Sequence, residues 1–128
     1  MDKQQTLTDF WNSFNIPAYD ENTVPDEKDR IEANGQAFPY ITYETSTDSF
    51  NYLVSCSASV WYRDTGWQDV TQKAEEIGAR ISRGGIMLNY DDGAIWLSKG
   101  SPWSRRMSDP DDDMVRRIVL NFNVEYMD

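Results

Sequence analysis

The clearest pattern in the sequence is an alternation of apolar and polar side chains near its end. From about Val115 to Met127, every second residue is apolar and most of the residues between are polar. The apolar set consists of Ile118, Leu120, Phe122, Val124 and Tyr126. A period of two residues is typical of a strand with one face in a core and the other toward water. The same alternation runs from Leu53 to Arg63 and predicts a second long strand.

Two other stretches follow the helical period. The first predicts a short helix at about Thr8 to Phe14, which Pro17 prevents from continuing far. Its apolar face consists of Leu7, Phe10, Trp11 and Phe14. The second predicts a helix at about Trp67 to Ser82, and Thr65 and Gln68 have the spacing of a capping box before it. Its inner stripe consists of Val70, Ala74, Ile77 and Ile81.

The remaining strands are shorter. Phe38 to Thr45 is rich in aromatic and β-branched residues, which favours a strand, and the polar stretch Ser46 to Asn51 predicts a turn after it. Ile86 to Tyr90 and Ala94 to Ser98 flank Asp91-Asp92-Gly93, which is a strong hairpin signal.

The expected order of elements is therefore α-β-β-α-β-β-β. We predict one α+β domain over residues 1–128, with a mostly antiparallel mixed sheet of about five strands and two helices packed on one face. Residues 18–35 are acidic and poor in apolar side chains. For this stretch we predict an exposed acidic loop, with one short helical turn near Asp26 to Glu32.

Composition excludes several kinds of chemistry. The chain has no histidine and a single cysteine, Cys56, so histidine catalysis, a Cys–His nucleophile, a zinc site and a disulfide framework are ruled out. Cys56 lies in the middle of a strand on its apolar side, so we expect a buried and unreactive thiol. We find no phosphate-binding glycine loop and no carboxylate pair set in apolar surroundings. We therefore expect no enzyme and no cofactor.

Charge and hydropathy limit the partners. The formal net charge of −10 opposes binding to phosphates, so we expect no specific nucleic-acid binding. No apolar run approaches the roughly 20 residues of a membrane span, so we expect no membrane contact. The opening ten residues lack the apolar region of a signal peptide, which together with the single thiol predicts synthesis inside a cell.

The densest group of carboxylates is the run Asp109-Pro110-Asp111-Asp112-Asp113. Hard cations bind through such oxygens, but the run lacks the glycine and the terminal glutamate of an EF-hand loop. A solvated acidic loop is the first interpretation. A loop that contacts a partner is the second, and a metal site is the third.

The segment from Lys99 to Arg106 is a second candidate, because it combines Gly100, Pro102, Trp103 and several cations. Tryptophan and arginine are favoured at the centres of protein interfaces. One interpretation is a surface loop with Trp103 packed back on the core. Another is a subunit contact in which arginines meet Asp109, Asp111, Asp112 or Asp113 of a neighbouring copy. These arginines are Arg105, Arg106, Arg116 and Arg117. Pairing within one chain is a third possibility.

Two further tryptophans depart from their surroundings. Trp61 lies on the polar side of its strand beside three serines, and Trp96 lies in the hairpin. Each is expected to cover the second face of the sheet or to enter a subunit interface. We include Trp61 among the candidate interface residues.

Several segments together resemble the small tail-terminator, or tail-completion, proteins of long-tailed phages and prophages of Gram-positive bacteria. The resemblance spans nearly the whole chain, although residues 18–35 form a longer stretch than the family pattern has. The segments are FWNSFNIPAY (Phe10–Tyr19), FPYITY (Phe38–Tyr43), GAIWLSKGSPW (Gly93–Trp103), DPDD (Asp109–Asp112) and VRRIVLNFNVEY (Val115–Tyr126).

The resemblance implies a subunit of a homo-hexameric ring at the head-proximal end of a phage tail. Such a ring caps the tail tube, stops polymerisation of the major tail tube protein and offers a surface to the head-tail connector protein. It implies a mixed sheet with helices on one side, a subunit that can stay monomeric until it meets the tube, and no catalytic residues. The protein would be located in the virion, and in the host cytoplasm during assembly.

Two alternatives stay open on the sequence. The chain could be a head-tail connector (neck) subunit or another non-enzymatic protein-binding module, since such proteins share the need for loops and sheet edges. A small enzyme that works with carboxylates alone is the other alternative, and it requires an apolar pocket that encloses two close carboxylates.

Overall fold

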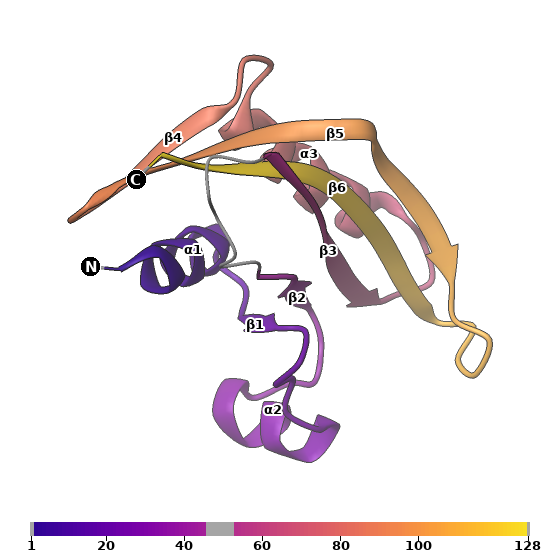
Figure 1. The fold of residues 1–128 in the computed structure, drawn as a ribbon. Helices are drawn as coiled ribbons and strands as arrows, with labels where there is room; N and C mark the ends of the chain where they lie inside the picture. The colour runs from indigo at the N-terminus through magenta and orange to yellow at the C-terminus, as the bar shows by residue number, and fades with distance from the viewer. Residues whose placement is uncertain (1, 46–52, 128) are drawn as a thin grey trace.

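The computed structural model describes residues 2–45 and 53–127 and has an α+β fold, as predicted (Figure 1). The turn expected at Ser46–Asn51 lies outside these residues. The elements are α1 (Lys3–Trp11), the 3-10 turn η1 (Asn12–Phe14), β1 (Ala18–Asp20), α2 (Glu27–Asn34), β2 (Tyr40–Tyr43), β3 (Leu53–Arg63), α3 (Gln68–Ile81), β4 (Ile86–Tyr90), β5 (Gly93–Ser108) and β6 (Val115–Met127).

The strands form one mixed sheet with the order β1-β2-β3-β6-β5-β4. Only β1 and β2 run parallel, and the other neighbours are antiparallel. The two long strands that the alternation predicts, β3 and β6, lie side by side at its centre, with Cys56 opposite Phe122. The mostly antiparallel mixed sheet is confirmed, but the expected five strands are six in the described part of the chain. The additional strand, β1, has three residues, which is too few for an alternation to show.

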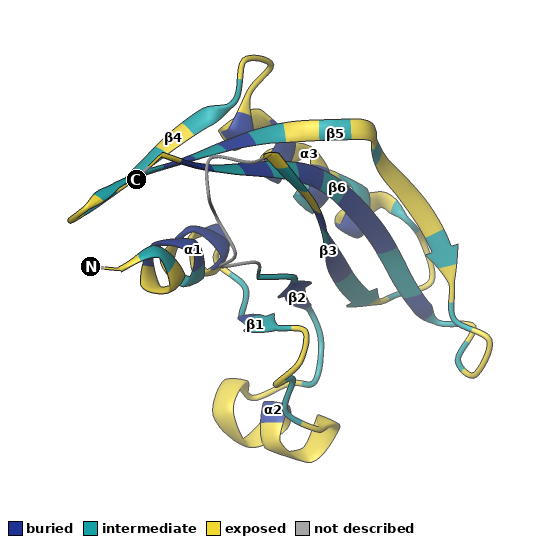
Figure 2. Cartoon of the chain, viewed as in Figure 1, coloured by how far each residue is buried: buried dark blue, intermediate teal, exposed yellow. Residues whose placement is uncertain are grey.

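Helices α1 and α3 cover the same face of this sheet, and the core lies beneath them. Trp11 of α1 stacks on Tyr43 with 5.9 Å between ring centroids and lies 5.3 Å from the ring of Phe122. Lys73 of α3 donates from Nζ to the carbonyl of Phe14 at 2.8 Å, which joins the two helical segments. The alternate apolar residues of β6 are all buried, so their predicted facing is confirmed (Figure 2).

The helix starts differ from the prediction. Helix α1 begins at Lys3 because the carboxylate of Asp2 caps it, accepting the backbone N–H of Gln5 at 2.8 Å. The capping box expected before α3 is wrong, since Trp67 occupies the N-cap position without a side-chain bond. The backbone N–H of Thr65 is bonded instead to Asp64 Oδ1 at 2.7 Å. The inner stripe of α3 is buried as predicted.

The acidic stretch 18–35 differs from the exposed loop that we expected, because it contains β1 and the eight-residue helix α2. The helical turn predicted near Asp26 to Glu32 is confirmed, since Asp26 caps α2. Most of its side chains are exposed, but Arg30 is only 8% exposed. The Arg30 guanidinium donates to the carbonyl of Pro25 at 2.7 Å and to that of Ala37 at 3.0 Å. One buried cation therefore holds α2 in place. The sequence of α2 has no apolar stripe that would predict a helix of this length.

The segment from Lys99 to Arg106 is not the loop that its glycine and proline suggest, since it belongs to the long strand β5. The register against β6 shifts between Lys99 and Ser104, so an irregularity accommodates Gly100 and Pro102 inside the strand. None of the helices that the structure describes is long and apolar enough to cross a membrane.

Candidate interface on the second face of the sheet

The face of the sheet opposite α1 and α3, here called the outer face, brings side chains of β2, β3 and β6 into rows. The register places Tyr40 opposite Trp61, and Trp61 opposite Arg117. Residues two apart on a strand share a face. Further residues of the outer face are Thr42, Ser55, Ser57, Ser59, Val119, Asn121 and Asn123. The outer face is thus aromatic and cationic at one end and polar at the other.

Four side chains at the aromatic end form a continuous stack that crosses three strands. The guanidinium of Arg30, on α2, lies 4.3 Å from the ring centroid of Tyr40. The rings of Tyr40 and Trp61 are nearly parallel, at 8°, with centroids 5.8 Å apart. The guanidinium of Arg117 lies 4.5 Å from the ring centroid of Trp61. Two cations therefore cap a pair of stacked aromatic rings, an arrangement that the negative faces of both rings stabilise.

Hydrogen bonds fix the orientation of the stack. Trp61 donates from Nε1 to Thr42 Oγ1 at 2.9 Å, which holds the indole flat across β2 and β3. Arg117 donates from Nε to Ser59 Oγ at 3.1 Å. Ser59 is itself buried, so this acceptor is fixed in position. In the part of the chain that the structure describes, the Arg117 hydrogen bonds use only Nε and leave both Nη groups for other acceptors.

The electrostatic setting of Arg117 combines burial with nearby charges. Desolvation is the largest effect and lowers the pKa of Arg117, while Glu21, Tyr40 and Asp109 raise that pKa. The second cation, Arg105, lowers the pKa of Arg117 further. Arginine stays protonated at physiological pH despite such shifts. This end of the outer face therefore keeps its positive charge, although the chain as a whole is strongly acidic.

The polar end of the outer face satisfies its own hydrogen bonds. The carboxylate of Glu44 accepts the backbone N–H of Ser57 at 2.7 Å and also the hydroxyl of Ser57. Ser55 donates from Oγ to Asn123 Oδ1 at 3.1 Å. A small hollow of about 270 Å³ lies beside these residues and reaches Gly100 of β5. The serine and asparagine side chains at this end thus pair with each other or with the partly buried carboxylate of Glu44.

Two of the candidate arginines lie on the other face of the sheet. The guanidinium groups of Arg106 and Arg116 lie 4.9 Å and 5.4 Å from the ring centroid of Trp67, which precedes α3. Arg116 also donates from Nη2 to the carbonyl of Thr65 at 3.0 Å. These contacts join the start of α3 to β5 and β6. Arg106 and Arg116 are thus engaged within the chain rather than displayed on the outer face.

Trp103 packs back against the protein, as the first interpretation of its segment expects. It lies over α3 at Gly78, where a β-carbon would stand 3.0 Å from Trp103 Nε1. The ammonium group of Lys99 lies 5.6 Å from the Trp103 ring centroid. The glycine at position 78 therefore provides the space that lets β5 approach α3.

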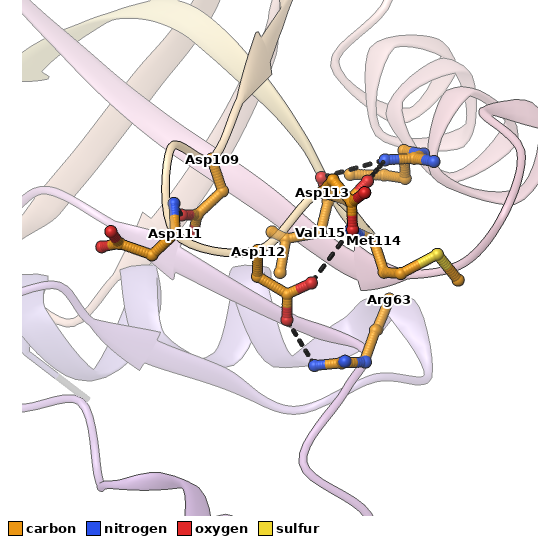
Figure 3. Close-up of polar contacts among 8 residues, drawn as sticks. Arg63, Asp109, Asp111, Asp112, Asp113, Met114 and Val115 are labelled. Atoms are coloured by element: carbon orange, nitrogen blue, oxygen red, sulfur yellow. Dashed lines mark hydrogen bonds and ion pairs between the residues drawn. The ribbon is translucent and has the colours of Figure 1, made fainter.

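The acidic run after β5 uses part of its charge to form its own turn (Figure 3). Asp112 forms an ion pair with Arg63 of β3, and its other oxygen accepts a backbone N–H two residues later at 2.9 Å. Asp109 accepts the backbone N–H of Asp111 at 2.8 Å. The internal partner is thus Arg63, which was not among the expected arginines. Within the run Asp109 to Asp113, the exposed residues are Pro110, Asp111 and Asp113.

The structure brings together four of the ten candidate residues, because Trp61, Arg117, Arg105 and Asp109 gather at the aromatic end of the outer face. Sequence reasoning missed Arg30 and Tyr40, which complete the stack. The FPYITY segment carries the only signal for Tyr40, since alternation places Tyr40 and Thr42 on one side of a strand. Nothing in the sequence points to Arg30.

A second hollow, of about 670 Å³, lies beside α3 and is lined by ionisable side chains. Lys73 and Glu76 form an ion pair there at 3.0 Å. Tyr62 lines this hollow, and burial, Asp69 and Glu76 raise the Tyr62 pKa. Over the described ranges, no three histidine, cysteine, aspartate or glutamate side chains come together as a metal-binding group. No family model and no curated protein matches the sequence.

Proposed function

We propose that this chain is a structural subunit of a phage virion, a tail terminator that caps the tail tube as a ring. In this role it stops polymerisation of the major tail tube protein and provides the surface to which the head connector binds. It would occupy the head-proximal end of the tail, after assembly in the host cytoplasm. The resemblance of five segments to that family supports the proposal.

The observation that carries the proposal is the form of the outer face. It presents a half-buried Trp61 and the cations Arg105 and Arg117 on a rigid sheet, and aromatic and arginine side chains are those that dominate binding energy at protein interfaces. Stacking and the bond to Ser59 already hold Arg117 in one orientation, so little side-chain entropy remains to be lost on docking. Such a surface suits contacts between subunits.

The same features favour a non-enzymatic role. The best-placed nucleophile by residue type, Cys56, is buried, and burial raises its pKa to about 11, so it is a thiol at physiological pH. On the outer face, the hydroxyl of Ser57 donates to the Glu44 carboxylate and that of Ser55 donates to Asn123 Oδ1. The charged end of the outer face carries arginines, which do not exchange protons at pH 7.

The test is electron microscopy of tails assembled in cells that lack this protein, with wild-type protein supplied from a plasmid as the control. Overlong tubes of variable length, restored to a single length by the plasmid, are the expected result. Tails of normal length beside detached heads would instead identify a head-tail connector or neck subunit, the alternative function. Normal tails joined to heads would overturn both.

A further inference from the structure

Helix α2 presents an unusual surface to solvent. Its inward side is tied to the sheet by Arg30 and by the bond of Asn34 Nδ2 to the hydroxyl of Tyr19 at 2.8 Å. On the outward side Ile31 is 46% exposed, and it shares a shallow groove with Lys28 and two acidic residues. The outward acidic residues are Glu27 and Glu32. Ile31 is thus exposed between two carboxylates and one ammonium group on α2, the helix at the bottom of Figure 1.

A surface with the opposite character lies on the outer face of β5 and β6. Arg105 and Met107 of β5 point to the outer face together with Arg117 of β6, since the register pairs Met107 with Arg117 and Arg105 with Val119. We call Arg105, Met107 and Arg117 the cationic patch. Asp109 offsets part of its charge, but the register makes Arg105 and Arg117 the neighbours of Met107 on this face. The cationic patch therefore has the reverse pattern of the outward side of α2.

Within one molecule the two surfaces lie on different parts of the sheet. Helix α2 is tied to Tyr40 of β2, whereas the cationic patch belongs to β5 and β6. Strands are about 4.8 Å apart, so three spacings separate β2 from β5 by about 14 Å. Both surfaces are nevertheless oriented by the same sheet, through Arg30 at one end of the stack and Arg117 at the other. A second copy of the chain can therefore bring one surface against the other.

We propose that α2 of one copy docks on the cationic patch of a second copy, with Ile31 against Met107 and the acidic side chains against Arg105 and Arg117. Because the contact joins two different surfaces, it repeats from copy to copy and generates a ring where the rotation closes. It rests on the proposed function in one respect only, namely that the ring of the terminator is built by this contact.

Charge favours a second copy over an unrelated protein. The chain carries 22 acidic and 12 basic residues, so two copies repel each other over most of their surface, except where cations are concentrated. The cationic patch provides such a place, and α2 supplies Glu27, one helical turn before Ile31, and Glu32, which directly follows Ile31. Opposite charges across the contact fix its register and penalise the reversed orientation, in which α2 would face α2.

Cysteine cross-linking tests this contact directly. The variant Ile31→Cys/Met107→Cys is oxidised at high protein concentration and low salt, and its products are separated on a non-reducing gel. Because each copy carries both halves, we expect a ladder that extends beyond dimers. Each single variant alone should stay at the level of the wild type, whose Cys56 is buried, and a mixture of the two single variants should give dimers only.

Charge reversal provides the second arm. Arg105→Glu in the double-cysteine background should weaken the ladder about tenfold, as expected for a close charge pair turned repulsive. Adding Glu27→Arg and Glu32→Arg should restore it. Arg105 is chosen because it is exposed, whereas Arg117 is bonded to Ser59.

The inference is overturned if the double variant forms no more cross-linked species than the wild type does. It is also overturned if either single variant alone forms as much cross-linked dimer as the mixture of the two single variants. A ladder that persists unchanged in Arg105→Glu would also overturn it. The tail-length experiment is independent of these results. If tails lacking the protein are overlong but the double variant gives no ladder, the proposed function stands and the proposed contact is wrong. If the double variant gives a ladder but tails lacking the protein have normal length, the contact stands and the proposed function is wrong.

Discussion

Replacing Arg30 with leucine should release α2 from the sheet while the core stays folded. Leucine keeps much of the apolar stem but removes the guanidinium, which is 8% exposed and holds the carbonyls on both sides of α2. These two carbonyls belong to Pro25 and Ala37. The helix itself is only eight residues long, which is too short to be stable without tertiary contacts.

The magnitude follows from the contacts that are lost. Each hydrogen bond from a charged donor contributes about 1.5–3 kcal/mol, and the stacking on Tyr40 adds roughly 1 kcal/mol. Part of this sum returns when α2 lifts, because the two carbonyls then bind water. We therefore expect the free energy of α2 docking to fall by about 2–4 kcal/mol. Arg30→Lys should lose nearly as much, because an ammonium group cannot fork between two acceptors and stack as well.

Amide hydrogen exchange separates local release from global unfolding. The N–H of Gly35, which bonds to the carbonyl of Ile31 at 2.8 Å, should exchange about 30-fold to 1,000-fold faster in Arg30→Leu, the factor that 2–4 kcal/mol implies. Amides of β6 should keep their protection. Lys28→Leu, an exposed substitution in the same helix, is the control and should leave the exchange of Gly35 unchanged. Equal exchange in Arg30→Leu and wild type would refute the role given to this cation.

Three further outcomes follow from the core and the backbone. Phe122→Ala should lower the free energy of unfolding by about 3–5 kcal/mol in urea titrations, since Phe122 is buried beneath Trp11, and an unchanged midpoint would contradict the facing of β6. Gly85→Ala should destabilise by about 1–3 kcal/mol, because φ is +90° and a β-carbon would stand 2.7 Å from a backbone oxygen, whereas Gly84→Ala has open space and should be tolerated. Burial, with Glu44 and Glu21 nearby, raises the pKa of Cys56 from 9.0 to about 11 and so favours the neutral thiol. Its stabilising contribution is complete below pH 9 and is lost as pH rises to 11, so the stability difference between wild type and Cys56→Ala should shrink by about 1–3 kcal/mol over that range, and a constant difference would contradict it.

The long strands could be predicted because alternation encodes their facing directly. In β6 the apolar set marks the core side residue by residue, and in β3 the serines mark the outer side. The pairing of β3 with β6 could not be derived, since many registers bury the same apolar set and topology selects one. The short strand β1 could not be predicted, because only its parallel pairing with β2 defines it as a strand.

The candidate interface was predicted only in part. Trp61 could be singled out because an aromatic residue on the polar side of a strand needs neighbours that shield its ring from water. In the structure these neighbours are Tyr40 on one side and Arg117 on the other. Arg106 and Arg117 look alike in the sequence, yet strand parity sends them to opposite faces. Parity across β5 could not be followed through the irregularity near Gly100, so the faces of the arginines beyond it were undetermined.

The stack also explains how a chain of net charge −10 can keep cations available for a partner. Had Arg117 been held by a carboxylate, its charge would be neutralised, and an incoming acidic side chain would have to displace that partner. A ring and a hydroxyl hold it instead, so its position is fixed while its charge still acts outward. Arg30 is held by the same means at the other end, with two carbonyls as acceptors, and its own charge is covered by α2. The same combination of ring stacking and neutral acceptors therefore holds both cations, and α2 covers the guanidinium of Arg30 whereas Arg117 is only partly buried.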